Sequence, residues 1–239
     1  MKIYTVIPTY NEAENLPLIV EELFKLPVED LHILVVDDNS PDGTGDIAES
    51  LRDQHHERIH VLHREGKQGL GTAYIQGFGI CLDNGAEAVV QMDADFSHSP
   101  KKVISLLAEL ESYDMVLGSR YVVGGSLDKR WTAWRKSLSS FGNLYARIIL
   151  GLPILDVTGG FRAWRRDTLL GIPLQRVKSQ GYAFQVEMAY ITHLLGYRIK
   201  EIPIYFAERE RGDSKMSFGI QIEAARRVWS ILYEYRDLK

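Results

Sequence analysis

Apolar residues recur along the first half of the chain in short, continuous runs that are rich in valine and isoleucine. The runs lie at Ile3–Ile7, Ile33–Val36, Ile59–Leu62, Ala88–Met92 and Met115–Leu117. Continuous apolar strands, unlike alternating ones, are typical of a parallel sheet that is covered on both faces. These runs therefore predict the strands of an α/β protein.

Between these runs, apolar residues return at helical spacing. A proline at the first turn, in Ser99-Pro100, marks the start of one predicted helix. The alternation of strand and helix predicts right-handed βαβ units and an open, doubly wound, mainly parallel sheet flanked by helices. The helical positions are Leu16, Ile19, Val20, Leu23 and Phe24 in one segment, and Val103, Leu106, Leu107 and Leu110 in another.

The pattern changes after Tyr121, where Gly124-Gly125 interrupts it. The second half of the chain predicts mainly amphipathic helices with one short strand. No internal repeat or linker separates the two halves, so we expect a single catalytic domain over residues 1–239. The predicted elements are a helix at Trp131–Leu152, a helix around Val186–Leu195, a strand at Ile199–Phe206 and a final helix at Phe218–Tyr235.

Composition narrows the class of protein. The net charge of −4 argues against a nucleic-acid binder, which would be basic. Cys81 is the only cysteine, so the chain forms no intrachain disulfide and a reducing compartment is favoured. Met1 runs almost directly into the first predicted strand, which indicates no secretory leader. The most apolar stretch, Ile148–Leu155, is much shorter than the ~20 residues of a membrane span, so any membrane contact is expected to be peripheral.

Polar residues cluster where four of the predicted strands end. In open α/β sheets, ligands bind outside the carboxyl ends of the strands. One such cluster is ordinary turn chemistry, because Asp, Asn and Ser favour turns. Four clusters at one edge of one sheet favour a binding site instead. They are Pro8–Glu12, Asp37–Ser40, Asp93–Asp95 and Gly118–Tyr121.

Within these clusters, Asp93-Ala94-Asp95 has the chemistry of a metal site. Hard divalent cations take oxygen ligands and are often held by one or two carboxylates together with substrate phosphates. Two aspartates that flank a small residue can place one carboxylate on the metal and the other on the ligand. Taken alone, the same three residues also fit a capped turn before the helix that follows.

Short motifs follow one another along the chain in this order: Pro8–Glu12, Asp37–Thr44, Gly69–Ala73, Asp93–Asp95, Gly118–Tyr121, Asp156–Arg162 and the run Arg209–Lys215. The first five, in this order, resemble the inverting GT-A glycosyltransferases of family two, and the last two resemble one subgroup of it. Within that family, the chain is most similar to the dolichol-phosphate (polyprenyl-phosphate) mannosyltransferases. That resemblance implies a GT-A fold and the transfer of mannose from GDP-mannose to a polyprenyl (dolichyl) phosphate with inversion, assisted by Mg²⁺ or Mn²⁺.

The resemblance also implies a role for each matching residue. Asp95 and Arg120 would be catalytic, with Arg120 facing the reacting phosphate. One position departs from the family, because some members carry a glutamine metal ligand where this chain has Ser97. The third metal ligand is therefore open between Ser97, a water molecule and His98. The nucleoside pocket would comprise Pro8, Tyr10, Glu12, Val36 and Asp38; the diphosphate and metal would be held by Asp93, Ala94 and Asp95, with Arg209 and Lys215 closing over them.

A lipid phosphate acceptor requires a second group of cations. Arg135 and Ser139 lie four residues apart on a predicted helix and therefore share a face. Together with Arg120 they are expected to bind the acceptor phosphate, because an arginine can donate two parallel hydrogen bonds to a phosphate. The same segment holds Trp131, Trp134 and basic residues, and so fits either a lipid interface or a helix packed on the core. We expect a peripheral protein on the cytoplasmic face of a membrane; a membrane-bound partner subunit stays open.

Other functions fit the sequence less well. The same fold could use UDP-glucose or another nucleotide-sugar, because the motifs report a nucleotide-sugar more firmly than its base. A sugar nucleotidyltransferase would need a glycine-rich, basic loop after the first strand, where this chain has Thr9–Glu12. A non-catalytic nucleotide-binding subunit would not need the full set of charged residues. Gly69-Leu70-Gly71 lacks the third glycine of a dinucleotide-binding loop, and the histidines between His55 and His63 lack the spacing of a zinc site.

Overall fold

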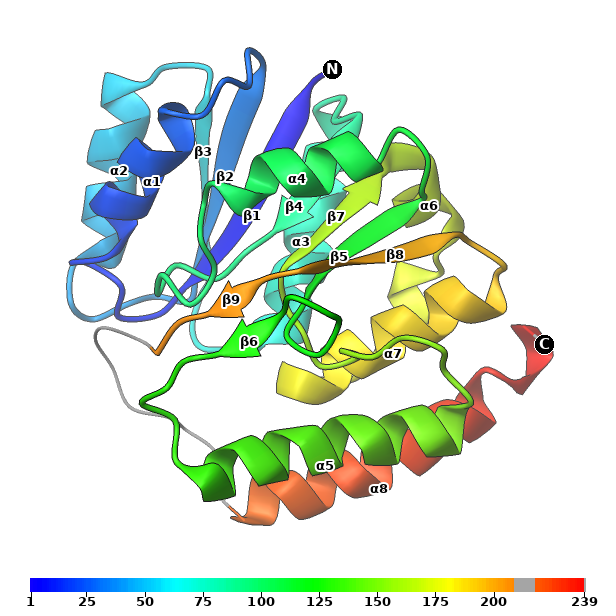
Figure 1. Ribbon diagram of the computed structural model, residues 1–239. Helices are drawn as coiled ribbons and strands as arrows, with labels where there is room; N and C mark the ends of the chain where they lie inside the picture. The colour runs from blue at the N-terminus through cyan, green and yellow to red at the C-terminus, as the bar shows by residue number, and fades with distance from the viewer. Residues whose placement is uncertain (209–217, 239) are drawn as a thin grey trace.

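In the computed structural model, a seven-stranded, mainly parallel sheet lies between layers of helices (Figure 1). The structure describes residues 1–208 and 218–238, without the side chains of 218–224. The strand order is β3-β2-β1-β4-β7-β5-β8, and β6 and β9 form a separate two-stranded sheet. The strands are β1 Ile3–Thr9, β2 Leu31–Asp37, β3 Ile59–His63, β4 Ala88–Gln91, β5 Met115–Ser119, β6 Ser126–Leu127, β7 Arg162–Arg165, β8 Ile199–Pro203 and β9 Tyr205–Phe206.

The five strands predicted from the apolar runs are all present, and the prediction of a mainly parallel sheet is confirmed. Strand β1 pairs in parallel with β2 on one side and with β4 on the other. Every residue of β2 is buried, as expected for a strand covered on both faces. Because neighbouring parallel strands end at the same edge, the polar residues after β1, β2 and β4 meet there.

Strand β7 was not predicted. It runs antiparallel between β4 and β5, so that Ala163 pairs with Val90 on one side and Val116 on the other. Its sequence, Arg-Ala-Trp-Arg, does not have the apolar run that identified the other strands. Arg162 is nevertheless fully buried, because its guanidinium donates to the carbonyls of Gly159 and Val157. A buried, hydrogen-bonded arginine thus interrupts the apolar run by which this central strand could have been predicted.

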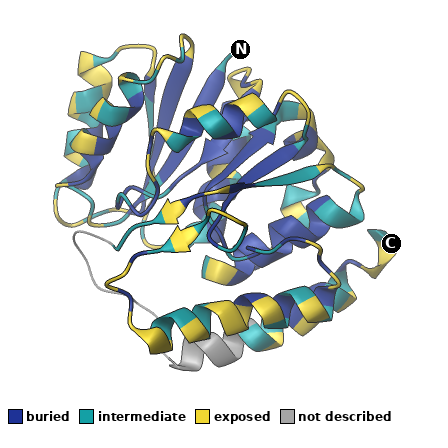
Figure 2. Ribbon diagram, in the orientation of Figure 1, coloured by how far each residue is buried: buried dark blue, intermediate teal, exposed yellow. Residues whose placement is uncertain are grey.

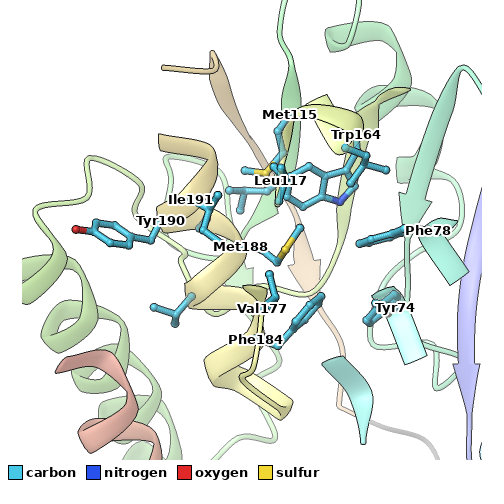
Figure 3. Close-up of a cluster of buried hydrophobic side chains, with 14 of the residues drawn as sticks. Tyr74, Phe78, Met115, Leu117, Trp164, Val177, Phe184, Met188, Tyr190 and Ile191 are labelled. Atoms are coloured by element: carbon cyan, nitrogen blue, oxygen red, sulfur yellow. The ribbon is translucent and has the colours of Figure 1, made fainter. Parts of the chain in front are cut away.

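Side chains that alternate along the strands pack against different helices. Ile3 and Ile7 of β1 belong to a core with α1, α2 and α4, whereas Tyr4 and Val6 belong to a core with α3 and α7. Figure 2 shows the buried sheet between these layers, and Figure 3 shows the second core. The helices are α1 Leu16–Phe24, α2 Thr44–Gln54, α3 Leu70–Asp83, α4 Lys102–Glu109, α5 Ala133–Leu150, α6 Arg166–Gly171, α7 Gly181–Leu194 and α8 Phe218–Glu234, with 3₁₀ turns η1 Leu174–Arg176 and η2 Arg236–Leu238.

Two predicted boundaries were wrong. The single strand predicted over Ile199–Phe206 is divided into β8 and β9, which belong to different sheets. Pro203 ends β8, and a proline has no N–H to continue the ladder. Helix α4 begins at Lys102 and not at Ser99, because the segment from Ser99 first forms a turn in which the Lys102 N–H donates to the Ser99 carbonyl.

Helices α5 and α8 lie side by side along one flank of the molecule (Figure 1). The Trp229 indole donates to the Tyr145 hydroxyl at 3.0 Å, and that hydroxyl donates to the Ala225 carbonyl at 3.2 Å. The face of α5 that is buried carries Asn143, Ala146 and Leu150. Among the described residues, no helix is both long and apolar enough to cross a bilayer.

Candidate active site

The ends of β1 and β2 are joined by a hydrogen-bonded turn. Asp37 accepts from the Thr9 hydroxyl at 3.0 Å and from the Ser40 hydroxyl at 2.5 Å, and the Asp38 N–H donates to the Thr9 carbonyl. Asp37 is therefore used by the turn itself, as expected for aspartate at a strand end. The carboxylate of its neighbour Asp38 has a different partner.

Asp38 forms a buried ion pair with Arg64, which follows β3. The Arg64 side chain is only 2% exposed and also donates to the Thr72 hydroxyl at 2.5 Å and to Gln68 at 3.1 Å. A charge this deeply buried is stable only when it is paired and hydrogen-bonded. Arg64 thus holds the Asp38 carboxylate in place just beyond the carboxyl end of β2.

The other residues predicted for the nucleoside pocket lie on β1, just after it, or on β2. Pro8 lies opposite Val36 in the sheet register, and Val36 is fully buried. Lys67 lies over the Tyr10 ring, 4.0 Å from its centroid. The Glu12 carboxylate accepts from the Asn15 amide at 2.8 Å. The structure therefore brings the five predicted positions to one edge of the sheet; their contact with a nucleoside stays a prediction.

The Asp93-Ala94-Asp95 segment leaves the end of β4 beside this group. Asp93 accepts from the Tyr74 hydroxyl at 3.3 Å, and burial together with the Asp93 charge raises the pKa of Tyr74 well above its ordinary value, so Tyr74 stays a donor. Asp95 is 5% exposed and accepts from the Ser97 N–H at 3.0 Å. Ala94 is buried and separates the two carboxylates.

Two buried groups next to these aspartates have no hydrogen-bond partner within the part of the chain that the structure describes. They are the Ser97 hydroxyl oxygen and the His98 Nδ1 atom. Both residues are at most 2% exposed, and burial lowers the pKa of His98, which favours the neutral ring that can act as a ligand. Unsatisfied buried polar atoms are rare and call for an explanation. Beside two carboxylates they fit the coordination sphere of a divalent cation, although no group of three or more His, Cys, Asp or Glu side chains among the described residues could hold a metal by itself.

Arg120, at the end of β5, is held by Asp156 in a buried bidentate pair. Its Nε and Nη2 atoms donate to the carboxylate at 2.7 and 2.6 Å, and Nη2 also donates to the Thr158 hydroxyl at 2.8 Å. Burial alone would raise the pKa of Asp156, but the Arg120 guanidinium outweighs it and holds that pKa below its ordinary value. The pair is therefore ionised, and no described residue is hydrogen-bonded to the Nη1 atom of this guanidinium.

Ser139 and Arg135, on α5, lie close to the Arg120 segment. The Ser139 and Tyr121 hydroxyls are hydrogen-bonded at 2.9 Å. Arg135 lies over the Trp131 ring at 3.7 Å and forms an ion pair with Glu208 at 2.6 Å. An incoming phosphate would therefore have to compete with Glu208 for this arginine.

The Phe206 ring, at the end of β9, connects the two halves of the site. It contacts His98 with ring centroids 5.3 Å apart, Trp131 at 5.7 Å, and the Arg120 guanidinium at 5.2 Å. The next residue, Ala207, donates its N–H to the Ser97 carbonyl at 3.1 Å. His98, just after the aspartate segment, and Arg120 of the predicted acceptor site thus share one aromatic neighbour, whereas Arg135 lies over Trp131.

Sequence reasoning missed several residues of this site. Asp156 lies in a motif that was recognised, but nothing local indicates that it pairs with an arginine 36 residues away. Arg64 and Phe206 were not singled out. The position of Arg64, an arginine shortly before the glycines of the Gly69 turn, is the signal that could have suggested it. The predicted donor residues Arg209 and Lys215 lie outside the described residues. Among the histidines weighed as zinc ligands, His60 contacts the Tyr4 hydroxyl and His63 pairs with Glu49.

Comparison with known proteins agrees with the fold and the motifs. The chain is 48% identical over 241 residues to an undecaprenyl-phosphate mannosyltransferase of Micrococcus luteus, covering 100% of this chain and 98% of that protein. It is 46% identical over 229 residues to a polyprenol monophosphomannose synthase of Mycolicibacterium smegmatis, covering 95% of this chain and 86% of that one. These relatives are similar over nearly their whole lengths.

Solved structures with the same fold are more distant in sequence. A mannosyl-3-phosphoglycerate synthase from Rubrobacter xylanophilus superposes with a TM-score of 0.69 at 19% identity, over 99% of this chain and 75% of that one. A glucosyl-3-phosphoglycerate synthase from Mycobacterium tuberculosis, solved with Mn²⁺, UDP and glucosyl-3-phosphoglycerate, superposes with a TM-score of 0.65 at 18% identity, over 97% of this chain and 78% of that one. These likenesses establish the GT-A fold. A family model described as glycosyl transferase family 2 matches residues 4–170, and the chain therefore belongs to that family of glycosyltransferases.

Proposed function

We propose that this protein transfers mannose from GDP-mannose to a polyprenyl phosphate, with inversion at the sugar. The named activities of the two relatives, which share nearly half of its residues, support mannosyl transfer to a polyprenyl phosphate. One observation carries the proposal most directly. The Phe206 ring contacts both His98, three residues after the carboxylate segment suited to a nucleoside diphosphate, and Arg120, an arginine suited to a second phosphate.

The donor would bind at the ends of β1, β2 and β4. Asp38, oriented by Arg64, would accept hydrogen bonds from the base or the ribose. Discrimination is strongest where a buried polar group is left unpaired by the wrong ligand. Asp93, Asp95 and Ser97 would hold Mg²⁺ or Mn²⁺, and the bound cation would neutralise negative charge on the diphosphate oxygens. Asp95 contributes a buried carboxylate, and Ser97 the unpaired hydroxyl oxygen noted above.

The acceptor would bind between β5 and α5. A phosphate monoester is largely ionised near neutral pH, so its oxygen can attack the sugar carbon without a general base. The new bond forms between that oxygen and the anomeric carbon while the bond to the diphosphate breaks, and GDP leaves on the opposite side. Arg120, Arg135 and Ser139 would hold the acceptor phosphate in line, which is the contribution that positioning makes to such a step.

Two phosphate groups in one pocket repel each other, and the site contains groups to offset that repulsion. Arg120 is fixed by Asp156, so no rearrangement of its side chain is needed when the acceptor arrives. Arg135 is 33% exposed and paired with Glu208, so its release from Glu208 would accompany acceptor binding. We infer that Arg120 orients the phosphate and that Arg135 adds binding energy.

The polyprenyl tail requires a lipid surface next to this site, and α5 with α8 provides a suitable face. The exposed residues of these two helices include six large hydrophobic side chains: Trp134, Phe141, Leu144 and Ile148 on α5, and Trp229 and Tyr233 on α8. Trp134 is 76% exposed and lies one residue before Arg135. A helical face of aromatic and aliphatic residues with basic neighbours is typical of interfacial binding. We propose that this face docks on the cytoplasmic side of a bilayer, which agrees with a chain that can form no intrachain disulfide.

Membrane docking can be tested by sedimentation with vesicles that contain anionic lipid. The triple variant Phe141→Ser, Leu144→Ser and Ile148→Ser should remain folded, because these side chains are 50–70% exposed, and should lose most vesicle binding. A matched control changes three exposed apolar residues elsewhere: Leu18, Ile104 and Leu170 to Ser. Loss of binding in both triple variants, or in neither, would contradict docking through this face.

The donor is tested by comparing initial rates with GDP-mannose, UDP-glucose and other nucleotide-sugars at a fixed polyprenyl phosphate concentration, with and without Mn²⁺. GDP-mannose should give the highest kcat/KM, and chelation should abolish turnover. A higher kcat/KM with UDP-glucose would support the alternative, in which the same fold transfers glucose. Equal rates in the presence of a chelator would contradict the metal assignment.

A further inference from the structure

The first turn of α3 has an unusual N-terminal cap. Helix α3 begins at Leu70, and the residue before it, Gly69, has no side chain that could accept from the first N–H groups. These N–H groups have no partner within the helix and need one elsewhere. The Gln180 side chain supplies it, because its Oε1 atom accepts from the Gly71 N–H at 3.0 Å. The capping residue thus comes from a segment 109 residues further along the chain.

The glycines of this turn allow the Gln180 segment to approach closely. A Cβ atom on Gly71 would collide with the Ser179 carbonyl oxygen and would lie 3.1 Å from the Phe184 ring. A Cβ atom on Gly69, whose φ is +99°, would collide with the Gln180 amide. Gly69-Leu70-Gly71 therefore serves packing between α3 and the segment before α7, which accounts for glycines that resemble part of a dinucleotide-binding loop.

The turn that Gln180 caps also holds Arg64. Arg64 donates to the Gly69 carbonyl at 3.3 Å and to the Thr72 hydroxyl at 2.5 Å. Thr72 is itself bonded to the Gly69 carbonyl at 3.0 Å, so these contacts depend on the shape of the turn. Through its ion pair, Arg64 then fixes Asp38.

The residue before Gln180, Ser179, is held by side chains of α7 and α8. The Ser179 N–H donates to Glu187 at 2.8 Å, and the Ser179 hydroxyl accepts from Arg227 at 2.7 Å. Glu187 is fully buried and pairs with Arg227 at 3.0 Å, and it also accepts from the Tyr235 hydroxyl at 2.7 Å. Hydrogen bonds therefore hold the backbone just before Gln180 in place, while the Gln180 residue itself remains exposed.

We propose that Gln180 is a positioning residue for the nucleotide-sugar donor. It caps the first turn of α3, that turn holds Arg64, and Arg64 presents Asp38 in the orientation that binds the nucleoside. This role rests on the proposed function, in which Asp38 lines the donor pocket. A preformed site binds its ligand more tightly, because no free energy is lost in ordering its side chains on binding.

Substitutions at Gln180 separate this role from a structural one. Gln180→Leu has a similar size but no acceptor, and it should raise the KM for GDP-mannose roughly fivefold to tenfold, the scale of one hydrogen bond. The kcat at saturating donor and the KM for polyprenyl phosphate should not change. Gln180→Glu keeps an acceptor oxygen at the same reach and should restore the donor KM to within about twofold of the wild-type value. Gln175→Leu, another exposed glutamine, is the matched control and should leave all three constants unchanged.

Two results would overturn the proposal. One is a donor KM that Gln180→Leu leaves unchanged; the other is a failure of Gln180→Glu to restore it while the protein remains folded by circular dichroism. The variant Asp38→Asn distinguishes a wrong role for Gln180 from a wrong assignment of the nucleoside pocket. If Asp38→Asn raises the donor KM and Gln180→Leu does not, only the positioning role is wrong. If Asp38→Asn leaves the donor KM unchanged, the assignment of the nucleoside pocket is wrong, and the role of Gln180 falls with it.

Discussion

The substitution Asp156→Asn tests whether Arg120 depends on its buried partner. Asp156 is fully buried and makes three hydrogen bonds with Arg120, at 2.9 Å to its N–H and at 2.7 and 2.6 Å to its guanidinium. Asparagine fills the same volume but removes the charge, which leaves a buried arginine without a counterion. Breaking a buried pair in this way typically costs ~3–5 kcal/mol.

That loss is large enough to measure by thermal and urea unfolding. For a chain of this length, each kcal/mol lowers Tm by about 2–4 °C, so a fall of roughly 6–20 °C is expected. The matched control is Asp237→Asn, because Asp237 and Arg176 form a bidentate pair at 2.7 and 2.8 Å that is exposed to solvent. Exposed pairs contribute about 0–1 kcal/mol, so this variant should unfold close to the wild-type temperature.

A double variant then separates stability from activity. Arg120→Met with Asp156→Leu replaces the pair by apolar residues and should recover much of the lost stability, as replacement of buried ion pairs often does. Transfer should remain lost, because no guanidinium faces the acceptor phosphate. Equal and small losses of stability for Asp156→Asn and Asp237→Asn would refute the reasoning, as would normal transfer by the double variant.

Three further predictions follow from other parts of the structure. Asp95→Asn should reduce transfer to roughly 1% of the wild-type rate or less while the Tm stays close to that of the wild type, because it removes a carboxylate charge that would hold the cation on the leaving diphosphate; normal rates at low Mn²⁺ would contradict this. Arg135→Ala should lower kcat/KM for polyprenyl phosphate roughly 10- to 150-fold, equivalent to ~1.5–3 kcal/mol, with donor affinity measured by calorimetry near normal; lost donor binding with a normal acceptor KM would contradict the assignment. Burial lowers the pKa of His60 from 6.5, so below about pH 6.5 the unfolded chain binds a proton that the folded chain does not, and stability falls as pH falls. His60→Gln should flatten that part of the pH profile of urea unfolding, and an unchanged slope would show that other groups cause it.

The sequence predicted the parallel strands well because their apolar runs are a local signal. Strands such as Leu31–Asp37 are buried on both faces, and continuous valine and isoleucine is the direct consequence. Strand β7 could not be found in this way, because it is central and yet contains Arg162, whose burial depends on carbonyls three and five residues earlier. A strand whose burial depends on such contacts has no apolar signature of its own.

The candidate site was predicted in part for the same reason. Polar residues at strand ends are local signals, and the strand ends bring Asp38 and Asp93 to one edge. Their partners are not local: Asp156 and Glu208 reach arginines 36 and 73 residues away. Spacing on α5 likewise identified an apolar stripe without deciding what covers it. The structure shows that Ala146 and Leu150 face the core, whereas Ile148 is 70% exposed.

The most direct test of the account is the product itself. The purified protein is incubated with GDP-mannose, Mg²⁺ or Mn²⁺ and vesicles containing polyprenyl phosphate, and the lipid extract is analysed by mass spectrometry and NMR. The account predicts a polyprenyl-phosphate mannose with an inverted, β-configured anomeric carbon, formed in equal amounts with GDP and only when metal is present. Release of GDP without a mannosylated lipid, or a product with retained configuration, would contradict it.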